Sequence, residues 1–342
     1  MDILEHSYAF GRSPLGAGAA ATHGDIYLFG GHIASSLSPR LHGLMFAARG
    51  VPWRFHLTET TDADRFTAQL QDPRCLGTSI TMPNKVAFCA QLDGLTDEAR
   101  AIGAVNTSFV RLDRKTGRRT HIGANTDCVG IRDAILARFP DAASTAHGRP
   151  AMVLGAGGAA RSAVYALWRW FGATEIYVVN RLHAEADDLI ASFAASVPAV
   201  RLRYVSQLHE MAALATPAIV VGTVPDLPPQ DADEVRCRAL CDAVLCRTDA
   251  DKGILLDMCY MPSPQTTLYT SAADNGWRVV SGTEVIARVC IAQQILWLEQ
   301  GVDEATAQQA VDAVVTTARP AGGRKATKTG RQDRQAVLGG KL

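Results

Sequence analysis

The sequence lacks the features of membrane, secreted and nucleic-acid-binding proteins. No apolar run in its 342 residues approaches the roughly 20 residues needed to cross a bilayer. Residues 1–6 show no basic start followed by an apolar stretch, so we expect no secretory signal. The formal net charge is zero with neutral histidines, which argues against a general nucleic-acid or membrane-surface role. We therefore expect a cytoplasmic protein with no nucleic-acid or membrane partner.

Cysteine is neither dense nor regularly spaced. The eight cysteines are scattered along the chain, and in a cytoplasmic protein they are most simply free thiols. Cys237, Cys241 and Cys246 lie close together, but they do not form the paired C-x-x-C spacing of a structural zinc site. We predict no bound metal.

The composition allows a sizeable core. Hydrophobic residues make up 47% of the chain, and its length suits two domains of ordinary size. Residues 319–342 differ, because they contain seven Lys or Arg, one Asp and few apolar side chains. We predict a disordered basic tail there, and we favour a solvated tail over a nucleic-acid contact.

Strand-like and helix-like segments alternate, which predicts an α/β fold with mostly parallel strands. In the first domain, 1–128, the strand-like segments are 26–33, 53–57, 77–81 and 104–112, and the helix-like segments are 41–49, 63–71 and 93–101. In the second domain, 129–282, a helix at 129–139 precedes the strand–helix–strand unit 151–154, 159–171 and 175–180, and strands follow at 218–221 and 254–258. A helix at about 283–318 is expected to run back onto the first domain.

A glycine-rich turn lies inside this strand–helix–strand unit. Its residues, Gly155, Ala156, Gly157, Gly158 and Ala159, match the start of G-x-G-x-x-G/A. The first glycine permits a tight turn, the second lets the backbone approach a pyrophosphate, and the helix N-terminus favours negative charge. Such turns also occur for packing reasons, but this context predicts a Rossmann-type dinucleotide-binding domain.

The next strand bears on the cofactor. It ends in Asn180 and Arg181 instead of an acidic residue that would hold the ribose of NAD. Arginine can stack on adenine and pair with a 2′-phosphate, which favours NADP, although Arg181 could also be a solvated loop residue. We also assign Thr223 and Gly282 to the cofactor site.

Two polar segments of the first domain predict a proton-transfer pair. Lys85 follows a strand-like run, and Asp127 lies in a turn rich in Gly, Asn and Thr. Oxidation of a secondary alcohol requires loss of a proton as the hydride leaves, and a lysine near a carboxylate can relay that proton. This chemistry needs neither a metal nor a covalent intermediate.

Taken in order, the motifs resemble those of the shikimate/quinate dehydrogenase family from about residue 26 to residue 297. The family patterns S-x-S-P, V-T-x-P-x-K, G-A-V-N-T and G-x-N-T-D-x-x-G are matched at 36–39, 80–85, 103–107 and 123–130. The resemblance implies an N-terminal substrate-binding domain and a C-terminal Rossmann-type domain. It also implies reversible NAD(P)-dependent oxidation of the C3 hydroxyl of shikimate or quinate.

The resemblance assigns roles to individual residues. Ser36 and Ser38 would hold the substrate carboxylate, helped by Tyr260. The residues that would bind ring hydroxyls are Thr81, Asn106 and Asp127. Lys85 and Asp127 would flank the hydroxyl being oxidised. Singly, the serines or Asp127 could cap helices and Lys85 could be solvated, but the joint pattern favours a site.

Two departures from the family pattern leave alternatives open. Val289 occupies the position of a family glutamine that contacts a ring hydroxyl, and Gln293 and Gln294 lie one turn further on. The substrate could therefore be shikimate, quinate or a ring without that hydroxyl. Leu182 and Glu185 replace the Thr and basic residue of NADP-using relatives, so NAD or dual use is the alternative to NADP.

Two rival functions also remain open at this point. One is a dehydrogenase of the same fold that acts on another hydroxy acid, which Val289 keeps possible. The other is a non-catalytic ligand sensor, against which the retention of Lys85 with Asp127 argues. The sequence does not distinguish a monomer from a homodimer, or a biosynthetic from a catabolic direction.

Overall fold

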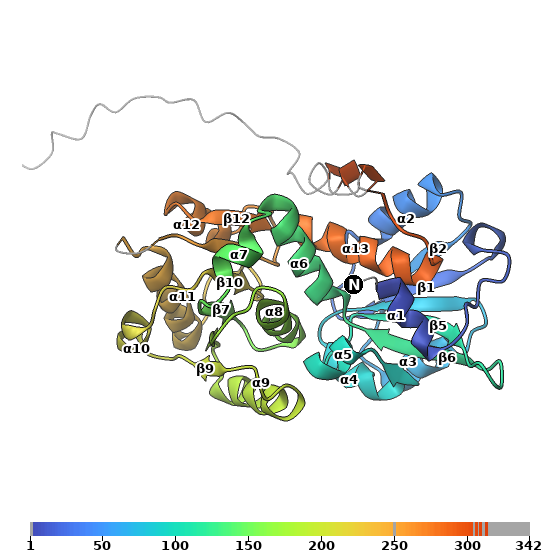
Figure 1. The fold of residues 1–342 in the computed structure, drawn as a ribbon, viewed down its shortest axis with the longest axis horizontal. Helices are drawn as coiled ribbons and strands as arrows, with labels where there is room; N and C mark the ends of the chain where they lie inside the picture. The colour runs from blue at the N-terminus through green and yellow to red at the C-terminus, as the bar shows by residue number, and fades with distance from the viewer. Residues whose placement is uncertain (1–2, 249–250, 304, 307, 310–311, 314–342) are drawn as a thin grey trace, which may run out of the picture.

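Two six-stranded sheets organise the computed structural model, which describes residues 3–248, 251–303, 305–306, 308–309 and 312–313. They form two lobes side by side (Figure 1). The predicted basic tail at 319–342 lies outside the described residues. No helix in the described part of the chain is long and apolar enough to span a membrane.

The first sheet is mixed and has the order β2-β1-β3-β5-β6-β4. Its strands are β1 (Asp25–Gly30), β2 (Arg54–Glu59), β3 (Cys75–Ile80), β4 (Gly94–Leu95), β5 (Thr107–Leu112) and β6 (Arg119–Ala124). Strand β1 pairs in parallel with β2 and β3, whereas β5 is antiparallel to both β3 and β6. The parallel half therefore sends the ends of β1 and β3 to the same edge.

Short helices accompany this sheet. They are α1 (Ile3–Ser7), α2 (Ser38–Ala48), α3 (Ala63–Leu70), α4 (Asn84–Ala87) and α5 (Asp97–Ile102), with 3₁₀ turns at Tyr8–Phe10, Ala19–Ala21 and Phe88–Gln91. Helix α5 starts later than predicted, because Thr96 caps its N-terminus and residues 94–95 pair with β6 as strand β4. The helix predicted at 93–101 was therefore wrong in its first turn.

The second sheet is wholly parallel, with the order β12-β11-β10-β7-β8-β9. Its strands are β7 (Ala151–Leu154), β8 (Ile176–Val179), β9 (Leu202–Tyr204), β10 (Ile219–Gly222), β11 (Ile254–Asp257) and β12 (Arg278–Ser281). Its helices are α7 (Ala142–Ala146), α8 (Gly158–Arg169), α9 (His183–Ser196), α10 (Leu208–Ala213), α11 (Ala232–Leu245) and α12 (Thr267–Asp274). The strand order reverses between β7 and β10, which is the doubly wound pattern of dinucleotide-binding sheets.

Helices α6 (Thr126–Arg138) and α13 (Gly282–Leu298) pack against each other between the lobes (Figure 1). The apolar face of α13 reaches both cores, since Val285 packs with the second sheet and Trp297 with the first. Beyond the helix end, Glu299 lies 2.9 Å from Arg111 of β5 and accepts a hydrogen bond from Tyr8. This buried ion pair ties the returning helix to the first lobe.

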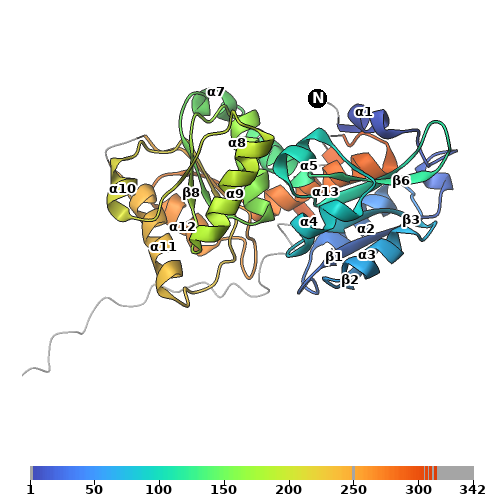
Figure 2. The same cartoon turned by 90° about the horizontal axis from the view of Figure 1, so that it is seen from below.

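The predicted α/β class is confirmed, and each lobe contains one of the two sheets. Figure 2 shows α8 facing α5 across the boundary between the lobes, where the two helices are in contact. The returning helix is observed from 282 to 298 and so ends well before the predicted 318, while several residues between 304 and 318 lie outside the described part. The limits proposed for the domains, 1–128 and 129–282, stay a prediction.

Candidate active site

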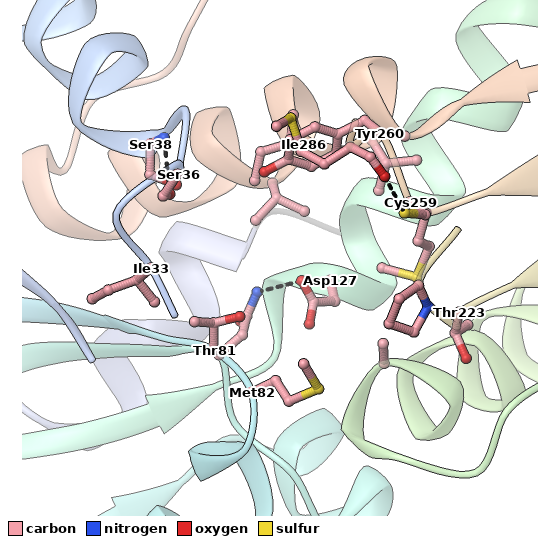
Figure 3. Close-up of a pocket in the computed structure, with 18 of the residues that line it drawn as sticks. Ile33, Ser36, Ser38, Thr81, Met82, Asp127, Thr223, Cys259, Tyr260 and Ile286 are labelled. Atoms are coloured by element: carbon pink, nitrogen blue, oxygen red, sulfur yellow. Dashed lines mark hydrogen bonds between the residues drawn. The ribbon is translucent and has the colours of Figure 1, made fainter. Parts of the chain in front are cut away.

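A cavity of about 590 Å³ opens between the lobes, at the carboxyl ends of strands from both sheets. Ligands of doubly wound sheets bind at this edge, where the strand order reverses. Figure 3 shows Ser36 and Ser38 at one end of the cavity, Thr223 towards the other, and Asp127 between them. The sequence-predicted residues that line the cavity are Ser36, Ser38, Thr81, Lys85, Asn106, Asp127, Ala159, Thr223, Tyr260 and Gly282.

The lysine–carboxylate pair lies in the middle of this cavity. Lys85 is on α4, directly after β3, and Asp127 is in the first turn of α6. Lys85 Nζ and Asp127 Oδ2 are 2.5 Å apart, and the two side chains are 14% and 8% exposed. A short charge-assisted contact with so little solvent around it fixes the orientation of both groups.

Asn106 holds the same carboxylate from the other side. Its Nδ2 donates to Asp127 Oδ1 at 2.8 Å, and its own Oδ1 accepts from the backbone N–H of Thr126 at 2.7 Å. Asn125, not Asp127, is the N-cap of α6 and accepts a first-turn backbone N–H. Asp127 is therefore free of any capping role, and its two oxygens point to Lys85 and Asn106.

Hydroxyl groups reach the cavity from both lobes. Helix α2 begins at Ser38, and Leu37 at its N-cap position makes no side-chain capping bond, so the first backbone N–H of the helix depends on Ser36. The Ser36 hydroxyl accepts the Ser38 N–H at 3.3 Å. Tyr260 comes from the loop after β11, and burial raises the pKa of its phenol to about 12. Tyr260 is therefore a neutral hydrogen-bond donor throughout the physiological range.

A buried carboxyl group supports the loop that carries Tyr260. Asp257, at the end of β11, accepts from Cys259 N at 3.1 Å and from the Thr266 hydroxyl at 2.5 Å. Burial raises its pKa to about 6. The loop also packs on the start of α13, where a Cβ on Gly282 would lie 2.4 Å from Met258 O. Gly282 therefore serves close packing beside the cavity.

The glycine turn joins β7 to α8, in the predicted position. Gly155 has a φ of 114°, and a Cβ there would lie 2.4 Å from Thr223 Oγ1, so the position requires glycine. The Thr223 hydroxyl donates to Leu154 O at 2.7 Å and links the turn to the end of β10. Gly157 is the N-cap of α8, and a Cβ there would meet no atom within 4 Å. The N-terminus of α8 therefore has open space beside Gly157, as the approach of a pyrophosphate to the backbone would require.

Two carboxylates flank the residues at the end of β8. Asn180 Nδ2 donates to Glu185 Oε2 at 2.8 Å. Arg181 Nη1 donates to Glu234 Oε1 at 2.7 Å, with Glu234 held in the first turn of α11. The Arg181 guanidinium, which the sequence suggested as a partner for a 2′-phosphate, is therefore already paired with the carboxylate of Glu234.

Val289 and Gln293 both line the cavity, one helical turn apart on α13. Gln293 Nε2 donates to Thr107 Oγ1 at 3.0 Å, and its Oε1 accepts from His42 Nε2 at 3.1 Å. Gln294 Nε2 donates to the other ring nitrogen of His42 at 3.0 Å, and burial lowers the pKa of this histidine to about 3. Both atoms of the Gln293 amide are thus engaged within the protein, whereas buried Gln294 Oε1 has no hydrogen-bond partner among the described residues.

Sequence reasoning missed the apolar rim of the cavity. Met82, Leu227 and Met261 line the cavity and are 64%, 64% and 43% exposed. Each stands in a loop that follows a strand end (β3, β10 or β11), and that position is the signal that could have found them. All eight cysteines are free, and no cluster of His, Cys, Asp or Glu within the described ranges is placed to hold a metal.

Comparison with known proteins places this site in a family. Residues 28–108 match the model described as the shikimate dehydrogenase substrate binding domain. A quinate dehydrogenase from Emericella nidulans is 36% identical over 293 residues, which cover 82% of this chain and 89% of that protein.

Two solved structures share the fold. Shikimate 5-dehydrogenase from Thermus thermophilus, in complex with NADP(H) and shikimate, has a TM-score of 0.64 at 25% identity, covering 85% of this chain and 99% of that one. Quinate dehydrogenase from Corynebacterium glutamicum, in complex with NAD, has a TM-score of 0.67 and covers 85% of this chain and 100% of that one. Its sequence identity is 22%, so this similarity supports the fold alone. From its motifs, its site and its similarity to the Emericella enzyme, the chain belongs to the shikimate/quinate dehydrogenase family.

Proposed function

We propose that this protein catalyses the reversible oxidation of the C3 ring hydroxyl of shikimate or quinate to a ketone, with a nicotinamide dinucleotide. One observation carries the proposal: Lys85 Nζ and Asp127 Oδ2, 2.5 Å apart, share a cavity with Ser36 and Ser38. Ala159, at the start of α8 and next to the glycine turn, lines the other side of the cavity. Membership of the shikimate/quinate dehydrogenase family supports the same reaction.

The proton in this reaction passes through Lys85. In the oxidative direction the neutral amine form of Lys85 accepts the proton of the reacting hydroxyl and becomes an ammonium. In the reverse direction this ammonium stabilises the alkoxide and returns the proton. Asp127 orients the lysine side chain, and Asn106 Nδ2 fixes Asp127 by donating to Asp127 Oδ1. The residues that we propose to bind the substrate are Ser36, Ser38, Thr81, Asn106 and Tyr260.

The second lobe fits a dinucleotide. Thr223 closes the turn against β10, and Gly155 and Gly157 leave the start of α8 open to a pyrophosphate. The nicotinamide ring of such a cofactor supplies the acceptor for the hydride. The chain positions the alcohol and moves the proton.

An absorbance assay for reduced nicotinamide tests the proposal directly. Purified protein is given shikimate or quinate, each with NAD or NADP, and at least one pair should give turnover. Asp127→Asn keeps the shape of the side chain but removes its charge, and should lower kcat at least about tenfold. Glu5→Gln, an exposed change on α1, serves as the control. Dinucleotide binding without turnover in all four pairs would refute the proposed substrates.

We further propose that NAD is the preferred dinucleotide. Glu185 and Glu234 place two negative charges beside the end of β8, where the adenosine ribose of a doubly wound fold lies. A 2′-phosphate there meets like charges, and Arg181 is held by Glu234. Each partly exposed like-charge contact costs about 1 kcal/mol.

Glu234→Gln tests this preference. Loss of the carboxylate frees Arg181 and removes one repulsion, so kcat/KM with NADP should rise by about three- to tenfold. With NAD, kcat/KM should change by less than about twofold. A wild-type enzyme that prefers NADP would overturn the preference without affecting the proposed reaction.

A further inference from the structure

The start of α8 touches the stem of the predicted catalytic lysine. A Cβ built on Gly158 would lie 2.9 Å from Lys85 Cβ and 3.2 Å from Lys85 Cδ. The contact joins the two lobes, because Gly158 is the first residue of α8 and Lys85 belongs to α4. It involves the near end of the lysine side chain, which cannot swing aside as its far end could.

The backbone does not explain a glycine at position 158. Gly155 has a positive φ, but Gly158 does not, and it takes ordinary helical geometry. Alanine is a better helix former than glycine, so an alanine here would favour α8 locally. The close approach of Lys85 is the physical reason that remains for the missing side chain.

The lysine has little room to retreat from this contact. Lys85 O accepts the backbone N–H of Val105 at 2.8 Å, which ties its main chain to the segment before β5. At the other end, Nζ is held 2.5 Å from Asp127. A methyl group on residue 158 must therefore tilt the lysine stem or push the lobes apart.

We propose that Gly158 is a positioning residue for Lys85: its missing side chain lets the dinucleotide lobe close onto the lysine and sets the direction of the ammonium. This inference rests on the proposed function and gives Gly158 a role separate from cofactor contact. The neighbouring Gly157 provides the contrast, because a Cβ on Gly157 would meet no protein atom within 4 Å. Gly157 thus leaves space for the cofactor, whereas Gly158 leaves space for the lysine.

The variant Gly158→Ala should separate catalysis from binding and stability. We expect kcat at saturating substrates to fall at least about tenfold, since a displacement of about 1 Å at a reacting group can cost far more. The Kd of the dinucleotide should change less than about threefold, and the melting temperature should hold or rise. In Gly157→Ala, by contrast, the main effect should be a raised Kd of the dinucleotide and not a lowered kcat. A Gly158→Ala enzyme with wild-type kcat would overturn the proposal.

A double-mutant cycle tests whether the effect passes through the lysine. In a Lys85→Ala background, Gly158→Ala should change the remaining kcat by less than about twofold, because no ammonium is left to misplace. Equal losses in both backgrounds would show that the glycine acts through something other than Lys85.

Pulse acylation read by mass spectrometry gives a measure that needs no substrate. Lys85 is 14% exposed, and its labelling rate should rise several-fold in Gly158→Ala relative to wild type, while that of the exposed Lys115 stays constant. Unchanged labelling of Lys85 would contradict the inference. This measurement stands even if shikimate and quinate prove not to be the substrates, so the two failures can be told apart.

Discussion

The two lobes differ in the groups that they bring to the cavity and its surroundings. In the first lobe the cavity is lined by side chains of defined chemistry, held by buried hydrogen bonds such as those from Asn106 to Asp127 and from Gln293 to Thr107. In the second lobe strands β7 and β8 are buried, and the turn between β7 and α8 is mostly glycine. Ala159, at the start of α8, lines the cavity beside side chains from the loops after β10 and β11, such as Thr223 and Met261. The proposed substrate site is therefore specified by functional groups, and the proposed dinucleotide turn by the shape of the chain.

This contrast predicts how each lobe tolerates change. A hydrogen-bonded network loses function when one donor or acceptor is removed, because its partner is left unsatisfied in a buried place. A backbone site loses function when atoms are added, because the ligand is excluded. The informative substitutions should therefore be those that remove a functional group from the first lobe and those that add side-chain atoms to the second.

The largest effect is expected from deleting the lysine. Lys85→Ala removes the proton relay and should lower kcat by about 10²–10⁴-fold, the usual range for a general acid–base group. Dinucleotide affinity, measured by calorimetry, should stay nearly constant because the turn is untouched. Lys115→Ala, in the exposed turn between β5 and β6, is the matched control. If Lys85→Ala kept the wild-type kcat, Lys85 would not be the proton relay.

An added side chain in the second lobe should have the next largest effect. Gly157→Val places two methyl groups where the pyrophosphate is expected and should weaken dinucleotide binding at least about tenfold. The fold should persist by circular dichroism, since a Cβ there meets no protein atom within 4 Å. Gly43→Val, at an equally open position on α2, should leave the affinity alone. Unchanged calorimetric affinity in Gly157→Val would exclude this turn as the cofactor site.

Buried titratable groups also distinguish the lobes. Burial lowers the pKa of His42 in the first lobe to about 3 and raises that of Asp257 in the second to about 6. His42 is held neutral, so the stability it contributes is present above pH 6.5 and is lost as the pH falls below it. Asp257 behaves in the opposite sense, because its folded pKa lies above the ordinary value of 3.8. Its contribution is fully present below pH 3.8 and is lost as the pH rises through 6.

Asp257→Asn should therefore stabilise the protein at about pH 8. The amide cannot ionise, and the shift sets an upper limit of about 3 kcal/mol on the gain. We expect about 1 kcal/mol, because Asn offers Thr266 a donor where the carboxylate accepted its hydroxyl hydrogen bond. Urea unfolding should show the gap between variant and wild type shrinking towards about pH 4. If the difference in free energy of unfolding between Asp257→Asn and wild type grew on acidification, the raised pKa of Asp257 would be contradicted.

The fold and much of the candidate site could be predicted from the sequence. Apolar runs and glycine turns locate the strands of the second sheet, and the order of motifs places Lys85 and Asp127 in one site. The pairing of Arg181 with Glu234 could not be foreseen, because 53 residues separate them and no local pattern links β8 to α11. The contact between Gly158 and Lys85 depends on how closely the lobes approach, which no single segment specifies.

The smallest effect is expected at Val289, where the lobes meet along α13. Val289 is 4% exposed and packs against Gly130 of α6, where a Cβ would lie 2.4 Å from its Cγ2. A longer, unbranched side chain at this position can extend into the cavity that Val289 lines. If shikimate or quinate is the substrate, Val289→Gln restores a partner for a ring hydroxyl and raises kcat/KM several-fold, from about 1 kcal/mol.

The control for this change is Val289→Met, which matches glutamine in length but offers no amide. If both variants change kcat/KM alike, the effect is one of volume and not of hydrogen bonding. If the natural ring lacks the hydroxyl, glutamine buries an unpaired amide and lowers activity on that substrate, whereas methionine does so less. We expect the gain, because the other polar residues of the proposed substrate site are all in place. If Val289→Gln raised kcat/KM for neither shikimate nor quinate, the substrate would be a modified ring. The apolar wall at α13 would then define what the first lobe binds as much as the hydroxyl groups opposite.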